Sequence, residues 1–271
     1  MMNQNQSKTI AYVTDIHLGQ HLQMDNALGD GKMSYSSNPD EHKENFILIL
    51  DDIKRRGIKE IIFGGDIGTK DANPWFFDKI KEYHFKLFMV LGNHDTFSTA
   101  SQYYNNGLTD GRNEMMYSFE ENHFKCIVLD SSNNIVSKTQ LDWLEWQLNT
   151  PKKVLLFIHH PVLKISTLLD EIGAALRERD RLKKILIDST SDITIFCGHY
   201  HMSDEATEKN IKQITSVAAS YQILKGSTKI ETDQNKFGYM LVQIEDNSIK
   251  YNTIYSAYLK EKSIKTRPII W

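Results

Sequence analysis

The sequence contains little cysteine and little proline, and it has no long uninterrupted hydrophobic run. Its two cysteines, Cys126 and Cys197, each lie inside a short apolar stretch, which favours small core residues over a disulfide framework. Every apolar stretch is shorter than the roughly 18 residues needed to cross a bilayer. The first residues also lack the basic and apolar parts of a signal peptide. We therefore expect no membrane span and a cytoplasmic location.

The chain also lacks a strong excess of either charge. Its formal net charge is -3 and its pI is near 6.4, whereas proteins that coat nucleic acid usually carry a strong positive field. We therefore do not expect nucleic acid as a partner, and nothing in the sequence indicates an oligomeric state. An apolar content of 40% over 271 residues supports a sizeable core, and we expect a single domain spanning residues 1–271.

Short apolar runs alternate with helix-patterned segments through most of the chain, which is typical of a sheet covered by helices. Near-continuous hydrophobic runs are expected of strands buried on both faces. The predicted strands are Thr9–Thr14, Glu60–Phe63, Lys86–Leu91, Phe124–Leu129, Lys153–Ile158 and Asp192–Cys197. The predicted helices are Pro39–Arg56, Pro74–Tyr83, Lys138–Leu148 and Leu169–Ile187.

Two further segments have a different pattern. Residues 205–271 contain alternating runs, such as Ile211–Val217, Tyr239–Ile244 and Ile249–Ile254, which predict antiparallel strands that complete a second sheet. The segment Gly19–Asn38 is rich in Gly, Asp, Asn and Ser and is predicted to be a long loop. The last residues, from Lys260 onward, fit no predicted element.

Five of the predicted strands end in residues that bind metal ions. The five ends read Asp15-Ile16-His17, Gly64-Gly65-Asp66, Gly92-Asn93-His94-Asp95, His159-His160-Pro161 and Gly198-His199-Tyr200-His201. Ligands of open α/β sheets gather outside the carboxyl ends of the strands, so these residues are expected to converge. Strand alternation would also place both ends of Asp-x-His and of His-x-His on one side of the chain. A lone His or Asp is more often structural or a helix cap, but agreement among five ends indicates a metal site without thiolates.

In this order the motifs resemble those of the calcineurin-like metallophosphoesterases, whose signature is D-x-H, G-D, G-N-H-[DE], H-x-P and G-H-x-H. Here it reads DIH, GGD, GNHD, HHP and GHYH, from Asp15 to His201. The resemblance implies an α/β fold: a four-layer α-β-β-α sandwich of two mixed sheets, with a binuclear metal site at the strand C-terminal ends.

The resemblance also implies two metal ions, divalent or trivalent, for which Mn, Fe and Zn all suit the ligands. The expected ligands are Asp15, His17 and His201 for one ion, Asn93, His159 and His199 for the other, and Asp66 as a bridge. His160 occupies the variable position of H-x-P and is expected to be a neighbour. A bridging carboxylate offsets the repulsion between cations about 3.5–4 Å apart, and a hydroxide shared by both ions would attack phosphorus.

Other residues are candidates for catalysis or substrate binding. His94 has no metal role in the family pattern and is expected to protonate the leaving oxygen or to hold the phosphoryl group. Asp95 either orients His94 or caps a turn. His21 could reach a substrate phosphate or be a solvated loop histidine. Tyr103 could stack on a base and Arg112 could bind phosphate, or both could be ordinary surface residues.

Weaker features bear on the substrate. The runs IVLDSS, TQLDWLEWQL, SYQ and GYMLVQIED look like those of class III cyclic-nucleotide phosphodiesterases and their glycerophosphodiesterase relatives, although the run after Pro161 lacks a second proline often seen there. We therefore expect a phosphodiesterase that acts on a small diester. A phosphomonoesterase or nucleotide phosphatase on the same centre is the alternative, ahead of a nuclease or a scaffold without catalysis.

Overall fold

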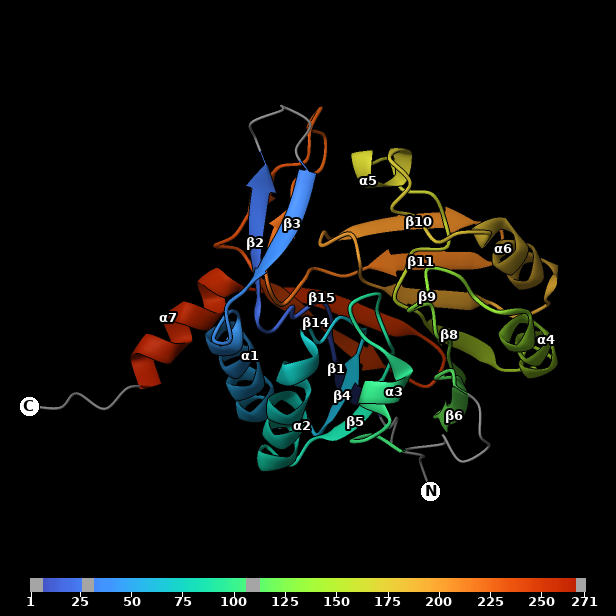
Figure 1. The fold of residues 1–271 in the computed structure, drawn as a ribbon. Helices are drawn as coiled ribbons and strands as arrows, with labels where there is room; N and C mark the ends of the chain where they lie inside the picture. Colours follow the sequence, from blue (N-terminus) through green and yellow to red (C-terminus); the bar gives the residue numbers. More distant parts are fainter. Residues whose placement is uncertain (1–6, 26–31, 106–112, 267–271) are drawn as a thin grey trace, which may run out of the picture.

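Two mixed β-sheets stacked face to face form the centre of the protein (Figure 1), as the computed structural model of residues 7–25, 32–105 and 113–266 shows. The first sheet has the order β15 (Ile249–Tyr255), β14 (Gly238–Ile244), β1 (Lys8–Val13), β4 (Glu60–Phe63), β5 (Lys86–Met89). The second has the order β10 (Asp204–Glu208), β11 (Ile211–Thr215), β9 (Ile193–Cys197), β8 (Lys153–Phe157), β7 (Phe124–Val128), β6 (Tyr117–Glu121). In the first sheet β1, β4 and β5 are parallel and β14 and β15 are added antiparallel on one side. In the second sheet β7, β8, β9 and β11 are parallel, and the edge strands β6 and β10 are antiparallel to their neighbours.

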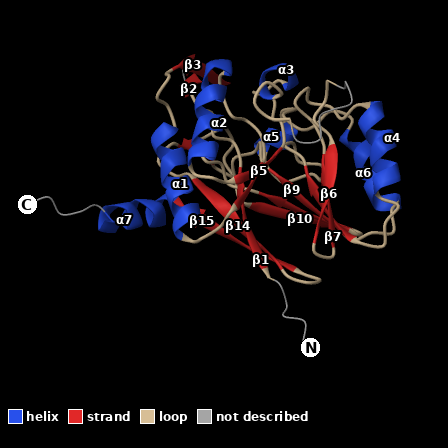
Figure 2. Cartoon of the chain, turned by 90° about the horizontal axis from the view of Figure 1, so that it is seen from below, coloured by secondary structure: helices blue, strands red, loops and turns tan. Residues whose placement is uncertain are grey.

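The alternation of side chains along β1 explains the layers. Ala11 and Val13 face helices α1 (Lys43–Arg55) and α2 (Asn73–Glu82), whereas Ile10 and Tyr12 pack into the apolar layer between the sheets. Helices α4 (Lys138–Gln147) and α6 (Arg179–Asp188) cover the outer face of the second sheet. Figure 2 shows the sheets between the two groups of helices, so the expected four-layer sandwich is confirmed.

The predicted loop Gly19–Asn38 is wrong over most of its length, because it contains a β-hairpin. Strand β2 (Gln20–Asp25) pairs antiparallel with β3 (Lys32–Ser37), and the hairpin projects beyond the sheets in Figure 1. Leu22 lies opposite Tyr35 in the register, and both belong to an apolar cluster with segments near α5 (Leu168–Glu171) and β12 (Gln222–Ile223). The apolar residues alternate with polar ones, and this short period was hidden by the turn-forming composition around it.

Other boundaries differ for local reasons. The predicted helix Leu169–Ile187 is divided into α5 and α6, with Gly173 (φ 88°) and Glu178 (φ 54°) in left-handed backbone between them. Helix α1 begins at Lys43 and not at Pro39, because His42 also has a left-handed backbone (φ 64°). The remaining short elements are the 3-10 turn Lys70–Ala72, α3 (Phe97–Ala100) and β13 (Thr232–Asp233).

The C-terminal part was expected to complete the second sheet, but only some of its strands do so. Strands β10 and β11 extend that sheet, but β14 and β15 lie at the edge of the first one. Residues 260–266 of the segment that fitted no element belong to helix α7 (Ser256–Thr266), which contacts α1 and β15, and the last five residues lie outside the described part of the chain. Cys126 and Cys197 are buried free thiols, as predicted. None of the described helices is long and apolar enough to cross a membrane.

Candidate metal centre

The carboxyl ends of β1, β4, β5, β8 and β9 meet at one place, where the five motifs bring their side chains together. Three sets of side chains there could each hold a metal ion, because the ligand atoms within a set all lie within 4.8 Å of one another. The sets are Asp15, His17 and His201; Asp66, His159 and His199; and His17, Asp66 and His94. Contacts join the sheets at this point, since His159 Nδ1 of the second sheet lies 2.8 Å from the Gly64 carbonyl oxygen of the first. The predicted convergence is therefore confirmed.

The backbone at these strand ends is not extended. Asp15 (φ 55°), His17 (φ 50°) and Asp66 (φ 62°) have left-handed conformations, as do His199 (φ 68°) and His201 (φ 50°). Asp15, His17 and His201 do meet, but strand alternation, the reason given for expecting this, does not apply because these residues are not in extended backbone. Left-handed backbone is uncommon for residues with a side chain and persists where surrounding contacts impose it.

Three histidines of the cluster each use one ring nitrogen to donate to a backbone carbonyl oxygen. His159 Nδ1 lies 2.8 Å from the Gly64 carbonyl oxygen, and His201 Nδ1 lies 3.1 Å from that of Tyr221. His199 Nε2 lies 2.8 Å from the Ala174 carbonyl oxygen, in the segment between α5 and α6. A carbonyl can only accept, so these nitrogens donate, and the opposite nitrogen of each ring carries a lone pair whenever that ring is neutral.

The remaining ring nitrogens of His17 and His201 face each other. His17 Nε2 lies 3.1 Å from His201 Nε2, while His17 Nδ1 lies 2.7 Å from Gln20 Oε1. Burial lowers the pKa of His17 to about 3, which keeps its ring neutral at neutral pH. Two bare nitrogens at this separation repel each other unless positive charge lies between them, and a metal ion supplies that charge.

Two buried carboxylates complete the arrangement. Asp15 Oδ1 lies 3.2 Å from His201 Nε2, within the first set of ligand atoms. Asp66 Oδ2 lies 3.2 Å from His159 Nε2 and 3.6 Å from His17 Nε2, so it stands between the two sets. Both side chains are almost fully buried, and a buried carboxylate is costly without a compensating positive charge. The site therefore requires compensating positive charge.

Asn93 provides an independent test of whether metal ions fit. Among the described residues, its buried Oδ1 has no hydrogen-bond partner, and neither has His159 Nε2. Buried polar atoms are normally paired, so these two atoms call for a ligand. The donor set of imidazole, carboxylate and amide oxygen, with the second nitrogens already held, fits two first-row metal ions.

His94 lies beside this cluster and is held from three sides. Its backbone N–H donates to Asp66 Oδ1 at 2.8 Å, and its ring Nδ1 lies 2.8 Å from Gln20 Nε2. The ring of Tyr35 meets it edge-on, with centroids 5.1 Å apart. Sequence reasoning missed Gln20 and Tyr35, because both come from the hairpin that was predicted to be a loop.

Asp95 does not have the expected orienting contact with His94. Its carboxylate accepts hydrogen bonds from the backbone N–H groups of Asp66 (2.7 Å), Ile67 (2.9 Å) and Gly92 (2.9 Å). Burial and the negative charge of Asp66 raise the pKa of Asp95, and these hydrogen bonds oppose the rise. The turn-cap alternative is therefore correct, and Asp95 ties the loop after β4 to the loop after β5.

The residues expected to bind substrate receive less support. His21 lies 3.1 Å from Glu41 at the base of the hairpin, and it belongs to none of the three sets. Tyr103 is half-exposed and stacks on Phe77 of α2 at a centroid distance of 5.3 Å. Arg112 lies outside the described residues. His160 is a neighbour, as expected, with Nδ1 2.9 Å from Ser131 Oγ.

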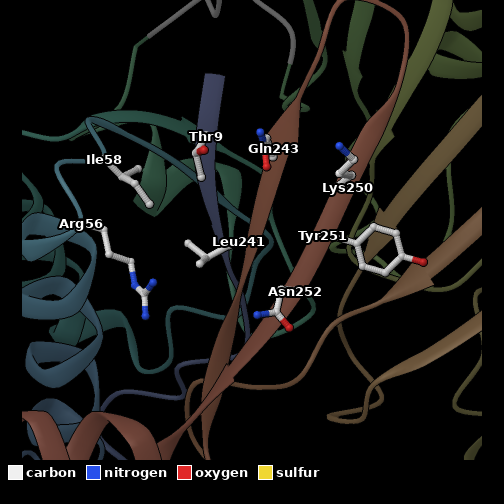
Figure 3. A pocket seen from close by; sticks show the side chains of 8 residues that line it. All are labelled: Thr9, Arg56, Ile58, Leu241, Gln243, Lys250, Tyr251 and Asn252. Atoms are coloured by element: carbon white, nitrogen blue, oxygen red, sulfur yellow. The ribbon is translucent and has the colours of Figure 1, made fainter. Parts of the chain in front are cut away.

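A hollow of about 450 Å³ on another part of the surface does not belong to this centre (Figure 3). Arg56, Leu241, Lys250 and Tyr251 are among its lining residues, from β14, β15 and the end of α1. None of its lining residues belongs to the three sets of ligand atoms. The hollow is therefore separate from the candidate metal centre.

Gly198 offers a first test of the geometry. A Cβ at this position would lie far inside van der Waals contact with Asp15 Oδ2 and Thr14 Oγ1. Gly198→Ala should therefore displace Asp15, lower metal content and reduce phosphoester hydrolysis by about 10²-fold, the effect of misplacing a reacting group by about 1 Å. Gly226→Ala, at a glycine with φ 89° and open space around it, is the control. Normal metal content in Gly198→Ala would contradict the placement of Asp15.

Comparisons with known proteins agree with the geometry. The sequence profile of the family described as calcineurin-like phosphoesterase matches residues 8–218. A protein of Arcobacter nitrofigilis named "Probable glycerophosphodiester phosphodiesterase" is 30% identical over 206 residues, which cover 71% of this chain and 75% of that protein. A protein of Fibrobacter succinogenes named "Probable cyclic nucleotide phosphodiesterase" is 23% identical over 163 residues, covering 59% of this chain and 64% of that protein.

Solved structures share the fold. A dimetal phosphatase from Danio rerio superposes with a TM-score of 0.61 at 14% identity, over 91% of this chain and 98% of that chain. A purple acid phosphatase from yellow lupin gives a TM-score of 0.59 at 13% identity, over 99% of this chain and 57% of that chain. Because the family profile matches most of its length, the chain belongs to the calcineurin-like phosphoesterase family and is a metal-dependent phosphoester hydrolase.

Proposed function

We propose that the chain hydrolyses small phosphodiesters at a two-metal centre built from the five motifs. In this proposal one ion is held by Asp15, His17 and His201, the other by Asn93, His159 and His199, and Asp66 is shared. The position of Asp66 is the observation on which the proposal depends, because its Oδ2 lies between His17 Nε2 (3.6 Å) and His159 Nε2 (3.2 Å). A carboxylate in such a position offsets the repulsion between two cations.

The protein's own residues would have separate tasks in the reaction. When bound, two such cations supply Lewis-acid activation of water and of the phosphoryl group. The carbonyl oxygens of Gly64, Ala174 and Tyr221 fix the rings of His159, His199 and His201, so the ligands are oriented before substrate arrives. His94 is the group proposed to donate a hydrogen bond from Nε2–H to the leaving oxygen as negative charge develops there, while the departing oxygen takes its proton from water.

Two observations support a diester as the substrate. Among the described residues outside the ligand sets, the side chains that contact His17 or His94 are those of Gln20, Tyr35 and Tyr221. All three are uncharged. A diester carries one negative charge and a monoester carries up to two, so a diester requires less positive charge beyond the metals. The two curated relatives described above are also named as phosphodiesterases.

The test compares a diester with a monoester that share one leaving group. With manganese added, we expect kcat/KM for bis(4-nitrophenyl) phosphate to exceed that for 4-nitrophenyl phosphate by at least about tenfold, a difference of about 1.4 kcal/mol in transition-state stabilisation. Glycerophosphoethanolamine and a 3′,5′-cyclic nucleotide then test the two small-diester classes. Chelator-treated protein is the control.

Faster hydrolysis of the monoester would overturn the diester assignment and favour a phosphomonoesterase or nucleotide phosphatase. Equal rates with and without chelator would overturn the metal-dependent mechanism itself. Metal content measured on the same preparation should approach two ions per chain, and the ion that restores activity after chelation identifies the preferred metal among manganese, iron and zinc.

A further inference from the structure

One side chain links the metal cluster to His94. Gln20, the first residue of β2, lies 2.7 Å through its Oε1 from His17 Nδ1 and 2.8 Å through its Nε2 from His94 Nδ1. We propose that Gln20 is a positioning residue that fixes the proton of neutral His94 on Nε2, the nitrogen that faces the leaving group. This proposal rests on the proposed function, in which Nε2–H of His94 donates a hydrogen bond to the leaving oxygen.

The direction of the two hydrogen bonds follows from the metal side. His17 Nε2 lies within the ligand cluster, 3.1 Å from His201 Nε2, so it must carry a lone pair to bind a metal ion. The proton of neutral His17 is therefore on Nδ1 and is donated to Gln20 Oε1. The amide NH₂ of Gln20 is then turned toward His94, whose Nδ1 has to accept.

The tautomer of His94 follows from the same reasoning. A neutral imidazole carries one N–H, so a ring that accepts at Nδ1 has its proton on Nε2. Asp95, the side chain expected to orient this ring, is occupied with three backbone N–H groups. Within the part of the chain that the structure describes, Gln20 thus makes the side-chain hydrogen bond that sets the protonation pattern of His94.

The backbone around Gln20 is fixed firmly enough for this task. Leu18 N–H donates to the Ile67 carbonyl at 2.7 Å, and Thr69 N–H donates to the Leu18 carbonyl at 2.9 Å. Gly19 adopts φ 76°, and a Cβ there would lie 2.7 Å from Thr69 Oγ1. The hairpin base is therefore seated against the loop after β4, which also carries Asp66.

Tyr35 limits the alternative orientations of His94. Its ring stacks on His17 (centroids 5.4 Å apart, planes 9° apart) and meets His94 edge-on at 5.1 Å. Tyr35 comes from β3, the partner of β2 in the hairpin. One hairpin thus supplies both the amide that sets the tautomer and the aromatic ring that restrains the imidazole.

The kinetic test uses Gln20→Met, which keeps the length of the side chain and removes both hydrogen bonds. With a diester that has an alkoxide leaving group, kcat should fall by about 10–100-fold, the usual effect of losing a partner that orients a catalytic group. With a 4-nitrophenoxide leaving group the fall should be much smaller, because its negative charge is delocalised and gains less from a hydrogen bond. Gln23→Met, an exposed glutamine on the same strand, should leave both rates unchanged.

A double-variant comparison separates positioning from general damage. If Gln20 acts through His94, Gln20→Met should cause no further loss of kcat with the alkyl diester when His94→Ala is already present. The same factor in both backgrounds would overturn the proposal. An equal effect of Gln20→Met on the alkoxide and 4-nitrophenoxide leaving groups, in protein that keeps His94, would also overturn the proposal.

A spectroscopic test does not depend on activity. In the zinc-loaded protein, ¹⁵N NMR of the imidazoles, assigned with the help of His94→Ala, should show the proton of neutral His94 on Nε2. In Gln20→Glu the carboxylate can only accept, so the proton should move to Nδ1. A proton on Nδ1 in the unmodified protein would overturn the proposal, as would an unchanged tautomer in Gln20→Glu.

These outcomes differ from a failure of the proposed function. If the unmodified protein hydrolyses no diester, or if His94→Ala leaves the rate with alkyl diesters unchanged, the proposed function fails in that respect. The NMR experiment then still decides whether Gln20 sets the tautomer of His94.

Discussion

Replacing Asp66 by asparagine is expected to abolish detectable phosphodiester hydrolysis while the protein remains folded. Asp66 is the carboxylate that stands between the two sets of ligand atoms, with Oδ2 3.2 Å from His159 Nε2 and 3.6 Å from His17 Nε2. Asparagine keeps the shape and an oxygen acceptor but removes the negative charge that would balance two cations. Loss of several kcal/mol of charge stabilisation in the transition state corresponds to a fall of more than about 10³-fold.

Metal content and activity measured on the same preparation decide this prediction. Asp66→Asn should bind fewer metal ions than the unmodified protein, and the rise in melting temperature on adding manganese should shrink, because a ligand stabilises only the state that binds it. Asp130→Asn is the matched control, since Asp130 is also buried but bonds to the backbone N–H groups of Met115 and Ser132. Full activity in Asp66→Asn would refute the shared-ligand role.

The strand framework could be predicted because its signal is local. The inner strands are buried on both faces and therefore read as continuous apolar runs, as in the predicted Glu60–Phe63, which matches β4. The edge strand β6 was missed because its burial alternates between partial and full exposure. Strand β14 was predicted as a strand, but its place beside β1 depends on pairing between distant residues, which periodicity does not report.

The candidate ligands could be named from motif order, but the groups that hold them could not. The acceptors of His159, His199 and His201 are backbone carbonyl oxygens, and any residue type can supply such an oxygen. Gln20 carries a side-chain signal, yet its meaning depends on the hairpin that brings it to His94. Chemistry at strand ends is therefore readable from sequence, whereas orientation of the ligands depends on tertiary contacts.

The role of Asp95 illustrates the same limit. Its position directly after His94 suggested a side-chain pair, but adjacent residues in a tight turn point in different directions. The turn places its carboxylate against the backbone of Asp66 and Ile67. Asp95 thus supports the loop that carries Asp66 and influences the centre through the position of that loop.

His94→Ala should leave the metal centre assembled and slow the reaction. We expect metal content close to that of the unmodified protein and a fall in kcat of about 10²–10³-fold with alkyl diesters, the usual effect of losing a hydrogen-bond donor to a developing oxyanion. The fall should be smallest with 4-nitrophenoxide, which leaves without a proton. His94 also forms a set of ligand atoms with His17 and Asp66, so a direct metal role predicts a different result, namely loss of bound metal.

Parallel measurements on the same variant distinguish the two roles. A hydrogen-bond donor to the leaving oxygen predicts a steeper dependence of kcat on the leaving group in His94→Ala than in the unmodified protein, with bound metal retained. A ligand predicts lower metal content and an equal loss with every leaving group. His123→Ala, at an exposed histidine between β6 and β7, is the control. Because Gln20 holds Nδ1 of His94 and leaves Nε2 for the leaving oxygen, we expect the first result.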